Sequence, residues 1–142
     1  LCHFKHYNIS RKQKNIDLLI NIKKNSFVYA DINAVNTIFR NLISNALKFT
    51  NSNGQVLVET HRKDDFIIAV VADNGVGMEQ KIVDNLFKME FNTSTRGTAN
   101  EKGTGVGLML CKELVEKING KMCVESEPEK GTKFYIYLPI KA

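Results

Sequence analysis

The fold of this chain is decided by one stretch of its sequence, DINAVNTIFRNLISNALKF, which covers residues 31–49. The stretch contains no Gly or Pro, and Asp31 stands where a helix N-cap is expected. Its apolar residues recur at spacings of three and four, and they are Val35, Ile38, Phe39, Leu42, Ile43, Ala46 and Leu47. This pattern predicts a helix over Ile32–Phe49 with one apolar face.

The segments around this helix predict a sheet and two shorter helices. Strands are expected at Asn15–Ile22, Gln55–Arg62, Phe66–Ala72, Lys121–Ser126 and Lys133–Leu138. Helices are expected at Glu79–Phe87 and at Gly107–Ile118, the second ending at Asn119-Gly120. Together these elements predict an α/β fold, a two-layer sandwich with a mixed, mainly antiparallel sheet of about five strands and about three helices on one face.

The length of 142 residues fits a single domain spanning 1–142. We expect residues 1–14 to be a remnant of a linker or of a preceding domain, because the chain begins at Leu1 and this segment is polar. Residues 88–104 lose all periodicity and fill with Thr, Ser, Asn, Gly and charged residues. A loop of that length inside a compact domain favours a functional lid.

Charge and hydropathy narrow the class of protein. The net charge of +5 suits a polyanion or a triphosphate site. Lys and Arg are scattered, with no dense basic run among aromatic residues, so we expect no nucleic-acid partner. The longest strongly apolar run, Phe66–Ala72, is too short to cross a bilayer. We therefore expect a cytoplasmic domain that is not membrane-embedded, and a membrane anchor elsewhere in a longer parent protein stays open.

The helix over Ile32–Phe49 carries a polar stripe as well as its apolar face. Asn41, Asn45 and Lys48 follow one another at i, i+4 and i+7, so they lie on one side of the helix. An amide oxygen is a neutral ligand for Mg²⁺, and an ammonium group suits phosphate. The stripe is compatible with a site for a Mg²⁺-phosphate group, and also with a solvated helix face, which is the commoner reason for Asn and Lys on a helix.

Two glycine-rich segments add to this stripe. Asp73-Asn-Gly75-Val-Gly77-Met follows a buried strand, where a carboxylate must find donors. The adenine amine and nearby backbone N–H groups are both candidates. The second segment opens the helix at Gly107–Ile118 and would expose N–H donors to phosphate. Its residues are Lys102, Gly103, Thr104, Gly105, Val106, Gly107 and Leu108.

These motifs, in this order and spacing, resemble the catalytic ATP-binding domain of sensor histidine kinases. That family shares a Bergerat-type fold with gyrase-type ATPases, heat-shock chaperones of the ninety-kilodalton class and mismatch-repair ATPases. The resemblance covers residues 15–139, nearly the whole chain. It rests on an asparagine box at Asn41–Thr50, a first glycine box at Asp73–Met78, a phenylalanine box at Leu86–Phe91 and a second glycine box at Gly103–Leu108.

The resemblance implies ATP and Mg²⁺ as cofactors and assigns a role to each matched residue. Asn45 would bind Mg²⁺ through its side-chain oxygen, with Asn41 supporting the metal and Lys48 contacting phosphate. Asp73 would accept a hydrogen bond from the adenine amine. Around the ring and the phosphates the resemblance further places Gly75, Gly77, Arg96, Lys102, Gly103, Thr104, Gly105, Val106, Gly107, Leu108 and Thr132.

Asn41 separates the branches of this superfamily. The ATPase branches place Glu there to activate water, whereas an amide has no basic lone pair that takes a proton near neutral pH. Slow hydrolysis and transfer of the γ-phosphoryl group to a histidine are therefore expected. His3, His6 and His61 do not stand in the family's acceptor context, which implies a histidine-bearing dimerisation domain and a response regulator as partners.

In this interpretation the isolated domain is a monomer and the parent kinase is a homodimer. Two alternatives stay open. One is a nucleotide-gated conformational ATPase, and the other is a degenerate module that binds partners without phosphotransfer.

Overall fold

The computed structural model describes residues 2–11, 14–87 and 107–142. In chain order its elements are β1 (Cys2–Arg11), β2 (Lys14–Lys23), α1 (Ile32–Phe49), β3 (Gln55–Lys63), β4 (Phe66–Asp73), α2 (Gln80–Asp84), α3 (Gly107–Lys117), β5 (Lys121–Glu127) and β6 (Gly131–Pro139).

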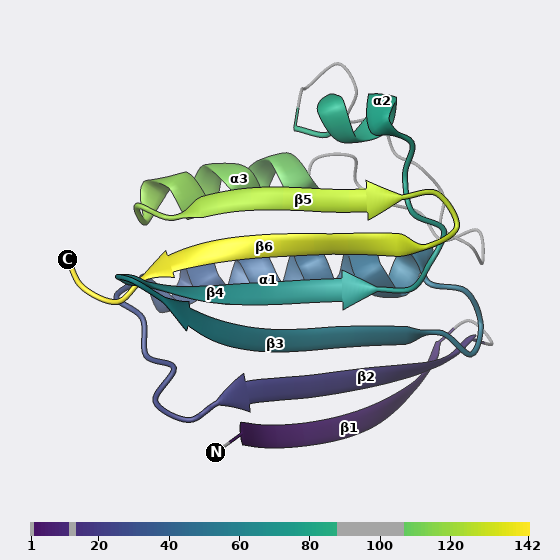
Figure 1. Cartoon of the computed structure of the whole chain (residues 1–142), viewed down its shortest axis with the longest axis horizontal. Coiled ribbons are helices and arrows are strands. Elements are labelled where there is room, and N and C mark those ends of the chain that lie inside the picture. The colour runs from purple at the N-terminus through teal and green to yellow at the C-terminus, as the bar shows by residue number, and fades with distance from the viewer. Residues whose placement is uncertain (1, 12–13, 88–106) are drawn as a thin grey trace.

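The strands form one sheet in the order β1-β2-β3-β4-β6-β5. Among the described strands only β2 and β3 pair in parallel, and every other neighbouring pair is antiparallel. Figure 1 shows α1 and α3 on one face of the sheet, with α2 beyond the edge strand β5. The predicted α/β sandwich with a mixed, mainly antiparallel sheet is confirmed, with six strands instead of about five.

The additional strand lies in the N-terminal segment, where the sequence predicted no strand. Residues 2–11 form the edge strand β1, which pairs with β2 from Cys2↔Lys23 to Arg11↔Lys14. Its outward-facing polar residues bond to β2, as in the 2.9 Å contact from His6 Nε2 to Asp17 Oδ1. An edge strand with polar outward positions lacks the apolar run by which buried strands are found.

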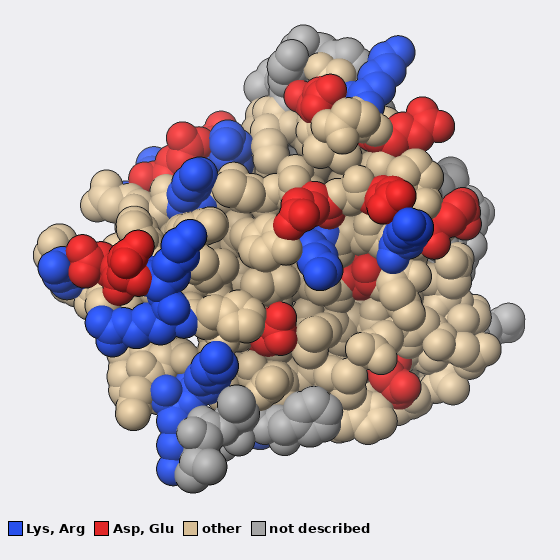
Figure 2. Space-filling view, in the orientation of Figure 1, with Lys and Arg blue, Asp and Glu red and all other residues tan. Residues whose placement is uncertain are grey.

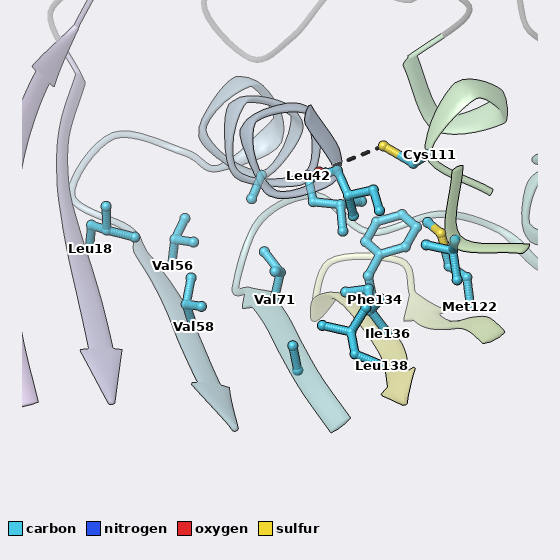
Figure 3. Close-up of a cluster of buried hydrophobic side chains, with 14 of the residues drawn as sticks. Leu18, Leu42, Val56, Val58, Val71, Cys111, Met122, Phe134, Ile136 and Leu138 are labelled. Atoms are coloured by element: carbon cyan, nitrogen blue, oxygen red, sulfur yellow. Dashed lines mark hydrogen bonds between the residues drawn. The ribbon is translucent and has the colours of Figure 1, made fainter. Parts of the chain in front are cut away.

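The helix α1 forms as its sequence predicts. The Asp31 carboxylate caps it by accepting from the backbone N–H groups of Asn33 at 2.7 Å and Ala34 at 3.2 Å. The fully buried residues Ile38 and Leu42 lie on its apolar face. Figure 3 shows Leu42 of α1, Cys111 of α3 and Phe134 of β6 in one cluster. The core therefore lies between α1, α3 and the sheet face that they cover.

Strand β4 is buried on both faces although helices cover only one. Ile67, Ala69 and Val71 face the helices, and Ile68 and Val70, on the other face, are 9% and 4% exposed. Val70 lies between its cross-strand partners on β3 and β6, whose side chains stand beside it. Figure 2 looks onto this uncovered face, where acidic and basic groups are interspersed over β3, β4 and β6.

The two shorter helices differ slightly from their predicted bounds. α2 ends at Asp84 rather than at Phe87, because the Asn85 side chain turns back to donate to the carbonyl of Lys81 at 2.8 Å, while Phe87 packs against the core. α3 ends at Lys117, one residue before the predicted Ile118, and Asn119 takes the left-handed conformation with φ of 62°. Within the described ranges no helix combines the length and apolarity that crossing a membrane requires.

Candidate functional site

Three elements end together on the right-hand side of Figure 1, where β4 and β5 reach their last residues. We call this end of the strands the site edge. Strand β4 ends there at Asp73, α1 ends there at Phe49, and the turn between β5 and β6 closes there. The sheet register places Asp73 beside Thr132 of β6, and Thr132 beside Ser126 of β5. Residues far apart in the sequence therefore share one edge.

The Asp73 side chain is partly buried at this edge and is held by backbone donors. The N–H of Gly75 donates to Asp73 Oδ1 at 2.9 Å. Burial raises the pKa of the Asp73 carboxyl to about 6, against smaller lowering effects of the backbone hydrogen bonds from Gly75 and Thr132. An ionised carboxylate has about four acceptor positions, so it retains capacity for a further donor.

The loop after Asp73 needs glycine for two different reasons. A Cβ at Gly75 would collide with the carbonyl oxygen of Phe49, so the loop could not approach the end of α1 as closely. Gly77 has a φ of +66°, which L side chains seldom adopt, and a Cβ there would collide with the Glu127 carbonyl oxygen. The glycines predicted at this loop therefore allow its backbone to lie close to both α1 and the β5–β6 turn.

Hydrogen bonds fix this loop on both sides. The N–H of Val76 donates to the carbonyl of Phe49 at 3.1 Å, and the Val76 carbonyl accepts from the N–H of Glu129 at 2.7 Å. The N–H of Met78 donates to Ser126 Oγ at 2.8 Å. The loop is thus preorganised by α1 and by the β5–β6 hairpin together.

Ser126 is a supporting residue whose role the sequence did not reveal. Its hydroxyl lies 2.7 Å from Thr132 Oγ1 and also donates to the carbonyl of Gly131 at 3.0 Å. A Ser and a Thr flanking a predicted turn at matching register would have indicated the pair. Thr132, predicted near the ring of a nucleotide, is 8% exposed and is held by this contact.

The polar stripe of α1 is partly buried rather than fully solvated, unlike the neighbouring Ser44. The Asn41 side chain hydrogen-bonds to the Cys111 thiol, whose pKa burial nonetheless raises to about 11. None of the described residues hydrogen-bonds to the Asn45 side chain. The Lys48 ammonium lies 4.8 Å from the centroid of the Phe49 ring. In this stripe the Asn41 amide is therefore held by a hydrogen bond, and the Asn45 amide is available to bind a ligand.

The donor groups at this edge limit the kind of metal that they suit. In the part of the chain that the structure describes, no three His, Cys, Asp or Glu side chains gather into a metal-binding group. A cation here would take neutral amide oxygens from the protein and further oxygens from a ligand or water. That combination fits Mg²⁺ bound together with phosphate groups.

Comparison with protein families shows which family this chain belongs to. Residues 30–142 match the sequence model of the histidine kinase-, DNA gyrase B- and HSP90-like ATPases. The chain belongs to this family. The match covers α1, the loop after Asp73 and every element that follows, and it starts after β1 and β2.

The relatives of this histidine kinase-like ATPase domain include sensor kinases. It is 36% identical over 114 residues to the adaptive-response sensory kinase SasA of Prochlorococcus marinus (strain MIT 9303), which is 80% of this chain and 30% of the relative. It is 36% identical over 103 residues to the sensor histidine kinase RcsC of Escherichia coli (strain K12), 72% of this chain and 11% of the relative. Sporulation kinase E of Bacillus subtilis (strain 168) is 31% identical over 135 residues, which is 94% of this chain and 17% of the relative. The chain spans less than a third of each of these relatives.

Solved structures agree with the fold. The catalytic domain of histidine kinase ThkA, in a nucleotide-free form, superposes with a TM-score of 0.75 at 22% identity, covering 97% of this chain and 96% of that one. Full-length ShkA in complex with AMPPNP superposes with a TM-score of 0.70 at 24% identity, covering 89% of this chain and 27% of that one. The predicted resemblance to sensor histidine kinase catalytic domains is confirmed at the level of family and fold.

Part of the predicted site of this histidine kinase-like ATPase domain lies outside the described residues. The residues concerned are Arg96, Lys102, Gly103 and Thr104 of the predicted lid, and Gly105 and Val106 directly after it. Gly107 begins α3 and Leu108 packs against the core. In Figure 1 α3 begins near the middle of the molecule, with its start turned toward the side on which α1 ends.

Proposed function

We propose that this domain binds ATP with Mg²⁺ and donates the γ-phosphoryl group to a histidine on a separate dimerisation domain, in two-component signalling. The observation that carries the proposal is the Asp73 carboxylate. It is partly buried, oriented by backbone N–H groups and left with acceptor capacity beside a close-packed glycine loop. A carboxylate in that setting suits an exocyclic amine on a flat ring.

The adenine end of the site would be formed by the edge of the sheet. Asp73 would accept from the adenine amine, Gly75 and Gly77 would let the ring approach the backbone, and Thr132 would bridge to the ring through water. The bonds that hold Thr132 and the loop in place support this arrangement, because a preorganised site loses less conformational entropy on binding.

The phosphate end would be formed by α1 and by the segment before α3. Asn45 would hold Mg²⁺ through its amide oxygen, Asn41 would support it and Lys48 would contact phosphate. The metal would neutralise charge that develops on the phosphates during transfer. From the lid and the start of α3, the further contacts proposed are Arg96, Lys102, Gly103, Thr104, Gly105, Val106, Gly107 and Leu108.

Phosphotransfer is favoured over hydrolysis by Asn41. Its side chain hydrogen-bonds to the Cys111 thiol, and an amide cannot accept a proton from water near neutral pH. The γ-phosphoryl group would then wait for an imidazole nitrogen, which forms the new P–N bond as the bond to the ADP oxygen breaks. His6 and His61 lie on strands with acidic partners, which does not favour them as acceptors.

The parent protein would be a dimeric kinase in the cytoplasm or anchored to the membrane, serving a response regulator. The support is that the relatives include sensor and sensory kinases, of which this chain matches between 11% and 30% of the length. The dimerisation domain with its histidine and the sensing region would lie in the remainder. The isolated domain would be a monomer.

Transfer of label from γ-labelled ATP tests the proposal, with and without a dimeric histidine-bearing partner domain. We expect labelled partner with the wild-type domain and with Ser44→Ala, an exposed control on α1. Asn45→Ala should lose the transfer. Steady ATP turnover without the partner would favour a nucleotide-gated ATPase. The absence of ATP binding in calorimetry at millimolar nucleotide would favour a degenerate partner-binding module.

A further inference from the structure

Lys14, the first residue of β2, is a buried lysine at the site edge of the molecule. It is 2% exposed. Its ammonium donates to the backbone carbonyls of Leu47 at 3.1 Å and of Lys48 at 2.7 Å. Lysine is almost never fully buried unless its charge is paired or hydrogen-bonded, because desolvation of an ammonium group is costly. Its burial here implies that these carbonyl contacts matter to the fold of this edge.

The contacts complete the C-terminal end of α1. The last four carbonyls of a helix have no partner within the helix, and a positive charge there also interacts favourably with the helix dipole. In α1 all four are satisfied, one by the side chain of its own C-cap residue and three by groups from other segments. The carbonyl of Ala46 accepts from Thr50 Oγ1 at 2.6 Å, those of Leu47 and Lys48 accept from Lys14, and that of Phe49 accepts from the N–H of Val76.

This helix end is shared by two parts of the molecule. On one side it is held by Lys14 from β2, and on the other it holds Val76 of the loop that follows Asp73. Asn45 immediately precedes these last four residues of α1. A shift of this turn would therefore move the proposed metal ligand and the glycine loop together.

We infer that Lys14 is a positioning residue for the nucleotide site: it fixes the last turn of α1, and through it Asn45, Lys48 and the loop after Asp73. This inference rests on the proposed function and deepens it. Lys14 lies before residue 30, where the family match begins, so the β1–β2 hairpin is a part of the site's support that the family model does not cover.

A regulatory consequence follows from this placement. Any movement of β1 and β2 relative to α1, imposed by whatever precedes them in the parent protein, would be transmitted through Lys14 to the last turn of α1. The hairpin would then change nucleotide affinity without touching the nucleotide. Coupling of this kind between two sites is commonly worth about 5- to 150-fold in affinity.

The test compares four forms of the chain by calorimetry with ATP, with and without Mg²⁺. They are wild type, Lys14→Met, Lys14→Arg and Leu18→Ala, and all are measured at a temperature where each is folded by circular dichroism. Leu18 is a core residue of the same strand that bonds to none of these carbonyls. Hydrogen exchange of the amides at 46–50 and 74–78 is measured on the same samples.

We expect Lys14→Met to weaken binding of ATP with Mg²⁺ at least about fivefold and to speed exchange in both segments. Lys14→Arg should recover most of both, and Leu18→Ala should lower the melting temperature while keeping the affinity. Unchanged affinity in Lys14→Met would overturn the inference, as would an equal loss in Leu18→Ala.

The failure of this inference can be told apart from failure of the proposed function. If the wild type bound no ATP, the proposed function would fail, and the exchange data would still test the positioning role. Unchanged exchange at 74–78 in Lys14→Met would then overturn it. Should Lys14→Met not fold, Lys14→Gln, which keeps neutral N–H donors, is expected to give an intermediate loss, and wild-type behaviour of that variant would count against the inference.

Discussion

Replacing Asp73 by Asn is expected to stabilise this domain while weakening its proposed function. The substitution keeps the shape of the side chain and removes its negative charge. In the folded chain that charge is partly buried, and burial raises the pKa of the carboxyl to about 6. At neutral pH the wild-type protein therefore holds an ionised group in a place that favours the neutral form.

The magnitude follows from the pKa. A rise from 3.8 to about 6 corresponds to about 3 kcal/mol of destabilisation at a pH well above 6. Asn would recover only part of this, because the bonds from Gly75 and Thr132 would no longer reach a charged acceptor. We expect a net stabilisation of about 1–2 kcal/mol, or roughly 2–8 °C in melting temperature for a chain of this length.

The dependence on pH gives the sharper test. The folded pKa of Asp73 lies above its unfolded value, so protonation favours the folded state. The wild type gains stability from this group as the pH falls through about 6, and the gain is complete below about 3.8. The advantage of Asp73→Asn should thus be full above pH 7 and vanish near pH 4.

The assay is thermal unfolding of wild type and Asp73→Asn between pH 4 and 8, with Asp84→Asn as an exposed control on α2. Calorimetry with ATP and GTP accompanies it, and Asp73→Asn is expected to weaken the preference for ATP. A lower melting temperature for Asp73→Asn at pH 7.5, or a difference that does not shrink in acid, would refute the electrostatic reasoning. An unchanged preference for ATP over GTP would refute the adenine role.

Three further substitutions test separate parts of the site. Asn45→Ala should remove the Mg²⁺ dependence of ATP binding in calorimetry, and retained dependence would contradict a metal role. Gly77→Ala should cost about 1–3 kcal/mol, because its φ of +66° strains any other residue, and chemical denaturation would show it. Ser126→Ala should cost about 1–3 kcal/mol by leaving the N–H of Met78 without its acceptor; a change below about 0.3 kcal/mol would show that the bond is dispensable.

The strongest local patterns in the sequence were the most reliable guides to the fold. The helix Ile32–Phe49 has apolar residues at helical spacing on one face and is capped by Asp31, so local sequence suffices to define it. Strand β1 was missed, because its outward-facing residues, such as His6, are polar at the sheet edge. Its position depends on pairing with β2, which no local pattern encodes.

The candidate site divides in the same way. Asp73 and the glycines after it were found because a carboxylate and a tight loop after a buried strand are unusual together. The supporting roles of Ser126 and Lys14 are not predictable from local sequence, since the Met78 N–H that Ser126 accepts from lies 48 positions away and the carbonyls that Lys14 bonds to lie more than 30 positions away. The roles of the lid residues, including Arg96 and Lys102, stay predictions.

The single parallel pair in the sheet bears on how the chain folds. β3, β4, β6 and β5 are antiparallel neighbours, and two of their contacts, β3 with β4 and β5 with β6, need only short turns. Parallel strands cannot be joined by such a turn, and here the connection from β2 to β3 includes the whole of α1. Because β2 and β3 lie on either side of α1 in the sequence, their pairing should form only once α1 has folded back onto the sheet. A neighbouring domain that pulled on the β1–β2 hairpin would therefore load α1 as well.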